Sequence, residues 1–524
     1  MKTYTWLPHI IDIPQEAKRN RTSLYTIALE GWRRGLTLKF HNIKTNPNAS
    51  KFVYSLSSKE RVHFFQESCG DMVTEEAREI CDNKQLTQEY LQKAEIPTPL
   101  SVSFIKNENV KTILNSISDM VYPLVVKPID GSGGKGVKTN INSELELIEA
   151  INQVRSKVSE KIIIQEQVHG DEVRIYVLGN EVIAAVKRVP ANVVGDGVKT
   201  INELIKEKND LRKKTPHLYY RAIVIDKAMH NKLKDYGLTV DSVLPEGKRI
   251  YLNTISNVSA GGEPIDFTDQ ITEKQKRIAI RANQAIPGLA HSGIDMIVND
   301  TDGTGIILEL NTRPGIGSHL YPIEGKAVDV PRKIIDYYFP ETITVREKKF
   351  KGNYYFDFQT VLNSLNNGYL EEIEISPCPE KEYSAKLIKL IGEIDIINIY
   401  SALKKIILRE GINGYIEREK SINILLAHYN EKVIEGIIDY INERQHNFFI
   451  KEIQITEYRG PLQLGFKIKD DYQHLGIVEL EHKFKENEKF LKGNTQEIKR
   501  IEKKLMRIKT STSWKITKII RKIK

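Results

Sequence analysis

The stretch VVKPIDGSGGKGV, from Val125 to Val137, decides how this sequence is interpreted. A β-branched run ends at Lys127, and the glycine-rich loop Gly131–Gly136 follows it directly. Glycine lets backbone N–H groups approach an anion without interference from side chains, and the lysine adds a positive charge to the same place. The stretch matches neither GxxxxGK[ST] nor GxGxxG. Taken alone, it is compatible with a phosphate-binding loop and with an ordinary surface turn.

Two later β runs carry polar side chains where a buried sheet should be apolar. GIDMIVND contains Asp295, and IILELNTRPGIGSH contains Glu309 and Asn311. A buried carboxylate is costly unless another group neutralises it. Mg²⁺ prefers such oxygen ligands and often shares them with substrate phosphates, so we predict a Mg²⁺ site here, with Mn²⁺ as an alternative ion. The structural alternative is a pair of buried salt bridges, for which Arg313 is near in sequence.

A third stretch, IIIQEQVHGDEVRIYVLGNEVIAAVKRVPA, runs from Ile162 to Ala191. Its apolar run leads into Glu166, and two strand-like segments follow. Such a run can present the Glu166 side chain and the backbone of Gln167 and Val168 to the edge of an adenine. This raises the weight of the phosphate interpretation of the glycine loop.

Seven ordered segments between about Glu76 and Pro340 resemble the ATP-grasp ligases, and are most similar to the ATP-grasp module of cyanophycin synthetases and fused glutathione synthetases. The segments are DNKQLTQEYLQKAEIPTP, VVKPIDGSGGKGV, QEQVHGDEVRIYVLG, VKRVPANVVGDGVKTINELI, SVLPEGKRIYLNTISNVSAGGEPIDFTD, GIDMIV and ELNTRPGIGSHLYPIEG. The resemblance implies an α+β, ATP-grasp fold in which two α+β subdomains grip ATP together with Mg²⁺.

The resemblance also implies roles for single residues. Those assigned to the nucleotide are Lys84, Lys127, Gly131, Ser132, Gly133, Gly134, Gly136, Glu166, Val168 and, near the ribose, Glu172. Those assigned to the metal are Asp295, Glu309 and Asn311. Those assigned to the carboxylate and acyl-phosphate site are Arg188, Arg313, Gly261, Gly262 and Gly315, while Arg174 matches the pattern without a clear role. Lys127, Arg188 and Arg313 are the expected catalytic residues.

The implied reaction is amide formation through an acyl phosphate. A substrate carboxylate attacks the γ-phosphoryl group of ATP, and an amine then displaces phosphate from the acyl carbon. The Mur-ligase-like module of cyanophycin synthetases and the glutamate–cysteine ligase domain of fused glutathione synthetases have no counterpart in this sequence. The substrates of those families are therefore not carried over, and we expect an amino acid, a peptide or a surface-glycan precursor.

Residues 350–480 are expected to form a separate ferredoxin-like domain. The order β-α-β-β-α-β in SAKLIKLIGEIDIINIYSALKKIILREGINGYIEREKSINILLAHYNEKVIEGIIDYINER and IKEIQITEYRG resembles the acylphosphatase fold. Tyr400 stands where that family has a phosphate-binding arginine, and Arg418 stands near the position of its catalytic asparagine. We therefore interpret this domain as a degenerate module used for packing or docking, and acylphosphatase activity as disfavoured.

The last residues, 481–524, are expected to be helical and basic. They carry 15 Lys and Arg against 5 Asp and Glu, so they account for the whole net charge of +9, and the rest of the chain has no nucleic-acid footprint. A short coiled coil and a solvated helix both fit the heptad spacing. The final SWKITKIIRKIK is compatible with contact to an anionic membrane surface and with packing on the protein itself. The ending TSTSWKITKIIRKIK also resembles the C-termini of bacterial glycosyltransferases of surface polysaccharides.

Four regions result: an N-terminal α/β region (1–80), the ATP-grasp domain (81–340), the acylphosphatase-like domain (350–480) and the tail (481–524). Three scattered cysteines and the lack of a signal-like apolar run suggest a cytoplasmic protein, with peripheral membrane contact and homo-oligomers left open. The leading hypothesis is an ATP-dependent carboxylate–amine ligase. The alternative is a non-catalytic, ATP-binding scaffold or regulator of surface-polymer assembly.

Overall fold

The computed structural model describes residues 6–46, 49–129, 136–156, 161–253, 256–258, 261–299, 303–349, 352–366, 370–419 and 421–469. The chain divides into two compact units, Met1–Glu380 and Lys381–Lys524. The predicted basic tail and its membrane helix lie outside the described residues, as do Gly131, Ser132, Gly133 and Gly134. Among the helices that are described, none has both the length and the apolar character needed to cross a membrane.

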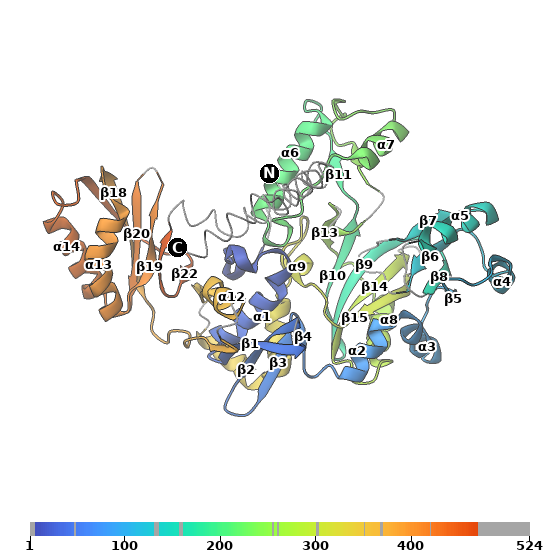
Figure 1. The fold of residues 1–524 in the computed structure, drawn as a ribbon, viewed down its shortest axis with the longest axis horizontal. Helices are drawn as coiled ribbons and strands as arrows, with labels where there is room; N and C mark the ends of the chain where they lie inside the picture. Colours follow the sequence, from blue (N-terminus) through green and yellow to red (C-terminus); the bar gives the residue numbers. More distant parts are fainter. Residues whose placement is uncertain are drawn as a thin grey trace, which may run out of the picture. The chain divides into compact units, whose positions relative to one another are not determined.

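The first unit contains a large antiparallel sheet with the strand order β13-β10-β9-β14-β15. The strands are β9 (Asp171–Leu178), β10 (Glu181–Val189), β13 (Glu263–Asp266), β14 (His291–Asn299) and β15 (Thr304–Asn311). The helices α2 (Glu75–Asp82), α3 (Lys84–Lys93) and α8 (Glu273–Gln284) contribute to the same core, and α2 and α8 lie against β15 (Figure 1). Six consecutive residues of β14, from His291 to Met296, are buried, and three of them, His291, Ser292 and Asp295, are polar.

A second sheet has the order β5-β8-β6-β7. Its strands are β5 (Ser101–Ile105), β6 (Leu124–Pro128), β7 (Lys138–Ile141) and β8 (Lys161–Glu166), and its helices are α4 (Val110–Ser116) and α5 (Glu144–Arg155). The apolar residues of these elements form a core of their own. The sequence predicted two α+β subdomains, and the two separate cores are consistent with that prediction.

A third core belongs to the segment between β10 and β13. It is built from α6 (Ile201–Lys214), η4 (Pro216–Leu218), α7 (Lys227–Asp235), β11 (Asn192–Val194) and β12 (Arg249–Tyr251). Helix α6 starts at a capping box, in which the Thr200 and Glu203 side chains each bond the other's backbone N–H. This segment places the end of α6 and η4 next to the loops that precede β13.

The N-terminal region belongs to the same compact unit as the two subdomains. It contains η1 (Pro8–Ile10), η2 (Gln15–Ala17), η3 (Arg19–Arg21) and the wholly buried helix α1 (Thr22–Arg33). Its sheet has the order β17-β1-β2-β3-β4, with β1 (Thr37–Asn46), β2 (Ala49–Ser57), β3 (Val62–Gln66), β4 (Cys69–Gly70) and β17 (Glu372–Glu374). The sequence assigned residues 350–380 to the C-terminal domain, whereas β17 pairs with β1 and the second unit begins at Lys381.

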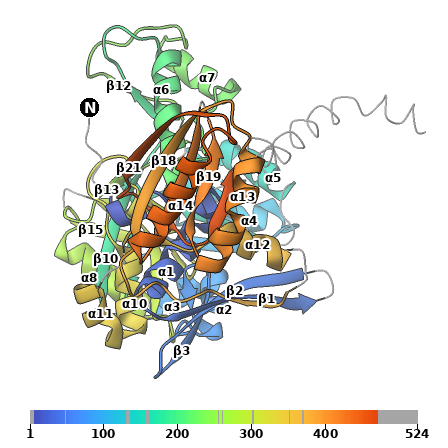
Figure 2. The same ribbon diagram turned by 90° about the vertical axis from the view of Figure 1, so that its left-hand side faces the viewer.

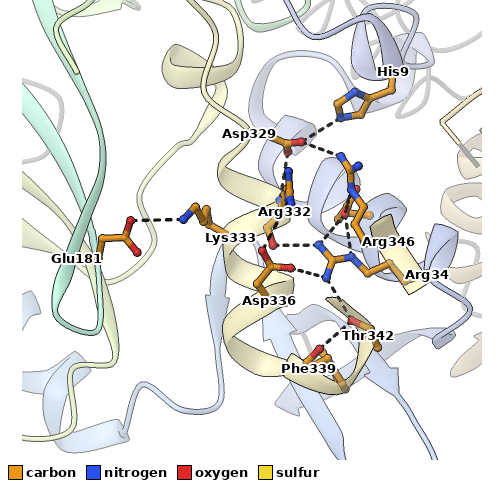
Figure 3. Close-up of polar contacts among 11 residues, drawn as sticks. His9, Arg34, Glu181, Asp329, Arg332, Lys333, Asp336, Phe339, Thr342 and Arg346 are labelled. Carbon is orange, nitrogen blue, oxygen red and sulfur yellow. Dashed lines mark hydrogen bonds and ion pairs between the residues drawn. The ribbon is translucent and has the colours of Figure 1, made fainter. Parts of the chain in front are cut away.

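Partly buried ion pairs join this N-terminal region to the C-terminal part of the first unit. Figure 3 shows Arg34 bonded to Asp336 and Thr342, and Arg346 bonded to Asp329. Arg34 also pairs with the buried Glu30 at 2.8 Å. The remaining elements at this end are α9 (Gly317–Leu320), α10 (Val330–Tyr338), η6 (Pro340–Thr342), α11 (Ile343–Lys349), β16 (Tyr354–Tyr355) and α12 (Phe358–Asn366).

The second unit has the strand order β21-β18-β20-β19-β23. Its elements are β18 (Ser384–Gly392), α13 (Ile396–Glu410), β19 (Asn413–Arg418), β20 (Ile422–His428), α14 (Glu431–Glu443), β21 (Ile450–Glu457), β22 (Leu462–Gln463) and β23 (Phe466–Lys469). Both helices share one apolar core with the sheet, and Figure 2 shows them side by side on one face. The order βαββαβ is that of a ferredoxin-like sandwich; the acylphosphatase resemblance itself stays a prediction.

Candidate functional site

The three predicted metal ligands lie on two adjacent strands of the large sheet. Asp295 on β14 is the cross-strand partner of Glu309 on β15, and Asn311 follows two residues later. Residues two apart on a strand project from the same face, and Asn311 Nδ2 donates to Glu309 Oε1 at 3.0 Å. The structure thus brings two carboxylates and one amide together.

Two guanidinium groups hold Asp295. Arg174 on β9 donates to both carboxylate oxygens, with Nη2 2.7 Å from Oδ2, and Arg188 Nη1 lies 3.2 Å from Oδ2. Burial opposes the ionisation of Asp295, but the two arginines outweigh it and hold its pKa well below the ordinary range. The role of Arg174, which the sequence left open, is to neutralise this carboxylate.

Arg313 is not part of this arrangement. The sequence proposed it as a salt-bridge partner for the buried acids, but its guanidinium lies 3.7 Å from Asp82, and both side chains are exposed. The alternative of a buried salt bridge thus holds for Asp295, but its partners are Arg174 and Arg188. Side chains on neighbouring strands reach Asp295 more directly than Arg313, which follows it along the chain. Gly315, two residues later, has open space around its Cα.

The acid pair fits a divalent cation. Burial and the negative charge of Asp295 raise the pKa of Glu309, because two carboxylates on paired strands cannot both be charged without cost. A bound cation removes that cost, and two carboxylates with an amide oxygen match the ligands that Mg²⁺ prefers. The described residues contain no cluster of three or more His, Cys, Asp or Glu side chains suited to an ion.

Two lysines, Lys127 at the end of β6 and Lys84 at the start of α3, act on the same site. Burial, followed by the charge of Lys84, lowers the pKa of Lys127 to about 8, whereas Glu309 acts in the opposite direction. Lys127 on β6 is therefore within electrostatic reach of the acid on β15. Lys84 Nζ donates to the Ile129 carbonyl at 3.0 Å, at the start of the glycine-rich loop. Both predicted phosphate-binding lysines thus lie close to the start of the glycine-rich loop.

The predicted adenine-binding segment forms hydrogen bonds with the backbone of the residues just before β6. Glu166 Oε1 accepts a hydrogen bond from the Val121 N–H at 2.8 Å, and the Gln167 N–H donates to the Pro123 carbonyl at 2.9 Å. Val168 is half-buried. Gly136 has a φ of +77°, and a Cβ there would lie 3.2 Å from Pro128 Cγ. Glycine is therefore required where the loop returns to the sheet.

Glu172 and the Gly261–Gly262 turn complete the arrangement around Arg188. Glu172 Oε1 accepts from Arg188 Nη1 at 2.6 Å, and its Oε2 accepts from the Ser256 hydroxyl. The buried Arg212 donates to the carbonyls of Gly261 and Gly262 at 3.1 and 3.3 Å. Arg212 is not predictable as a site residue from the sequence, because its surroundings, KNDLRKK, have the pattern of a solvated helix.

Comparison with known proteins supports the predicted resemblance to the ATP-grasp ligases. Residues 81–225 match the RimK-like ATP-grasp domain. The chain is 34% identical over 272 residues to the cyanophycin synthetase of Crocosphaera subtropica, covering 50% of this chain and 31% of that protein. It is 31% identical over 274 residues to the glutathione biosynthesis bifunctional protein GshAB of Pasteurella multocida, covering 50% and 36%.

The chain spans about a third of the length of the curated relatives it matches. Among solved structures, the bifunctional glutathione synthetase from Pasteurella multocida is similar with a TM-score of 0.45 and 26% identity, over 58% of this chain and 41% of that chain. The family match and the curated relatives confirm the predicted resemblance: the chain contains an ATP-grasp domain.

Proposed function

We propose that this chain, with its ATP-grasp domain, is an ATP-dependent carboxylate–amine ligase that forms an amide bond through an acyl phosphate. The observation that carries the proposal is the convergence of opposite charges on one place. Lys84 and Lys127 come from one side, and Asp295, Glu309 and Asn311 come from the other. A triphosphate needs both kinds of group, since the lysines neutralise its oxygens and the acids hold the accompanying Mg²⁺.

The chain's own residues explain the first half of the reaction. Asp295, Glu309 and Asn311 would hold Mg²⁺, which supplies charge neutralisation for the phosphates when bound. Lys127, at the end of β6, is positioned to draw electron density from the phosphoryl group being transferred. The carboxylate of the first substrate attacks that group, so ADP leaves and an acyl phosphate forms.

Arg174 and Arg188 support the second half. Both are largely buried and lie together on Asp295, so they form a fixed pair of donors. Once a cation engages Asp295, the two guanidinium groups would stabilise the oxyanion that forms when an amine attacks the acyl carbon. Ser256 and Arg188 both bond Glu172, which orients this part of the site.

We propose an amino acid, a peptide or a surface-glycan precursor as substrate. The test is an ADP-release screen of amino acids and short peptides with Mg²⁺ and ATP, followed by mass spectrometry of the products. We expect ADP and a condensed product of matching mass with the correct pair. Lys127→Ala should lose ADP release, and Lys386→Ala, which removes a lysine paired with Glu431 in the second unit, should keep it. ADP release by Lys127→Ala at the wild-type rate would contradict the proposal.

The non-catalytic scaffold is the competing function. Its distinguishing result is tight binding of the ATP analogue AMP-PNP with no turnover across the whole panel of acids and amines. The retention of two acids and an amide beside Lys127 favours the ligase, because a nucleotide-binding scaffold has no need of a costly pair of buried carboxylates.

A further inference from the structure

A second cluster of polar side chains lies close to the candidate site. It consists of His217 in η4, Arg221 shortly after it, and Ser318 in α9. His217 Nε2 lies 3.1 Å from Ser318 Oγ and 3.3 Å from Arg221 Nη1. Ser318 and Arg221 are half-buried, so a solute can reach them. We call these three residues the donor cluster.

The donor cluster has more donors than acceptors. Burial, together with the charges of Arg221 and Arg212, lowers the pKa of His217 well below its ordinary value, so the ring is neutral. A guanidinium can only donate, so Nε2 accepts from Arg221 and the proton resides on Nδ1, which has no partner. The Ser318 hydroxyl competes for the same single lone pair. At least one donor is thus left without an acceptor.

The geometry around His217 shows that this packing is specific. A Cβ on Gly317 would lie 2.4 Å from His217 Nδ1, so only glycine fits there. Arg212 Nε donates to the Arg221 carbonyl at 2.6 Å and fixes the backbone that carries the guanidinium. The donor cluster is therefore held in place from two sides.

Arg221 lacks an acidic partner. Its second contact is with Asn20 Oδ1 at 3.3 Å, and within the described part of the chain no carboxylate lies at ion-pair distance from it. Burial and the nearby charge of Arg19 lower its pKa. A partly buried guanidinium without a counter-charge is costly, and an anion from solution would remove that cost.

His319 connects the donor cluster with the candidate site. It is 1% exposed, and neither ring nitrogen has a hydrogen-bond partner among the residues that the structure describes. Burial and the charges of Arg174 and Arg188 lower its pKa to about 3, and the same ring acts on His217. The arginines that hold Asp295 thus act on His319, and His319 in turn acts on His217 of the donor cluster.

We propose that His217, Arg221 and Ser318 bind a carboxylate that does not react, such as the free carboxylate of an amino acid or peptide that supplies the amine. A carboxylate is an acceptor only, it carries the missing negative charge, and its two oxygens match the fork of a guanidinium. The inference rests on the proposed function and deepens it, because it favours an amino acid or peptide over an amine without a carboxylate.

The first test uses succinate as a probe and needs no turnover. The full chain is saturated with AMP-PNP and Mg²⁺, and its melting temperature is followed as sodium succinate replaces sodium chloride at constant ionic strength. A ligand that binds only the native state raises the melting temperature. We expect a rise in the wild type, a smaller rise in Arg221→Lys and none in Arg221→Met. An equal rise in Arg221→Met would overturn the proposal.

Matched controls separate this inference from the proposed function. Arg61→Met removes an arginine that already pairs with Glu60 and Glu341, and it should respond to succinate like the wild type. Inorganic phosphate is the second probe, and a larger rise with phosphate than with succinate would overturn the carboxylate assignment. Calorimetry of AMP-PNP binding is run on every variant; a wild type that binds no AMP-PNP would count against the proposed function instead.

A second variant covers the case in which Arg221→Met does not fold. Ser318→Ala removes a single hydroxyl and should weaken the apparent succinate affinity several-fold, while AMP-PNP binding stays unchanged. Unchanged succinate affinity in Ser318→Ala would overturn the proposal. Once a substrate pair is known, replacing the amino acid by its amide should lower kcat/KM by more than tenfold in the wild type but not in Arg221→Met.

Discussion

Arg174 and Asp295 are joined by two hydrogen bonds across the neighbouring strands β9 and β14, although 121 residues separate them in the chain. Arg188, on β10, contacts the same carboxylate. A cation that binds beside Asp295 therefore meets a carboxylate already neutralised by two guanidinium groups. We expect metal binding to compete with these contacts and to make the two arginines available to other anions.

Replacing Asp295 by Asn should destabilise the first unit strongly. Arg174 would then be buried without its counter-charge, whereas Arg188 would keep Glu172. Breaking a buried pair in this way costs about 3–5 kcal/mol. The measurement is urea unfolding followed by tryptophan fluorescence, since Trp32 is fully buried in this unit. Asp82→Asn is the control, because it breaks only the exposed contact with Arg313 and should cost about 0–1 kcal/mol. Equal effects of the two substitutions would contradict this assignment.

Nucleotide affinity should fall as the pH rises above about 8. Burial lowers the pKa of Lys127 to about 8, and a bound phosphate raises it again, so above that pH each binding event must take up a proton. Affinity then falls by up to about tenfold per pH unit. Calorimetric titration of AMP-PNP between neutral and alkaline pH measures the slope. Lys127→Met should bind more weakly at neutral pH and show a flat profile; a slope retained in this variant would assign the proton to another group.

Stability should decrease as the pH falls below about 6.5, the ordinary pKa of histidine. Burial lowers the pKa of His291 to about 4, and the ring is bonded to Tyr176 and Tyr338. Between these two pH values the histidine binds a proton in the unfolded chain but not in the native state. The free energy of unfolding should thus fall by about 1.4 kcal/mol per pH unit for each such histidine.

Urea unfolding at a series of pH values checks this sign. His291→Gln should reduce the slope between pH 6.5 and about 4. The control is His230→Gln, which replaces an exposed histidine and should leave the slope unchanged. A pH dependence that is identical in all three proteins would show that His291 binds a proton equally well in the native and unfolded states.

The second unit should not hydrolyse acyl phosphates. Tyr400 stacks on Phe466 with ring centroids 6.5 Å apart, and Arg418 donates to the Ile394 carbonyl, so neither side chain is in a position to perform that chemistry. We expect benzoyl phosphate to be consumed by the full chain no faster than by Lys127→Ala. Hydrolysis by the wild type that Tyr400→Ala abolishes would restore the acylphosphatase interpretation.

Much of the candidate site was accessible from local patterns. Lys127 at a strand end before glycines, and the acids in the apolar runs of β14 and β15, are short-range features, and the structure places Asp295, Glu309 and Asn311 on one face. Gly136 is also predictable, because its positive φ follows from the return of the loop to the sheet. The end of the first unit was not predictable, because β17 joins a sheet whose other strands lie more than 300 residues earlier.

The sequence by itself determined which of the segments around the site are strands and which of them carry the oxygen-bearing side chains, because those properties depend on side chains a few positions apart. Only the tertiary structure decided that Arg174 and Arg188, not Arg313, neutralise Asp295, and that Arg221 has a neutral histidine beside it instead of an acid. Charge pairing depends on distance in space, and strand order, which local pattern does not encode, sets that distance.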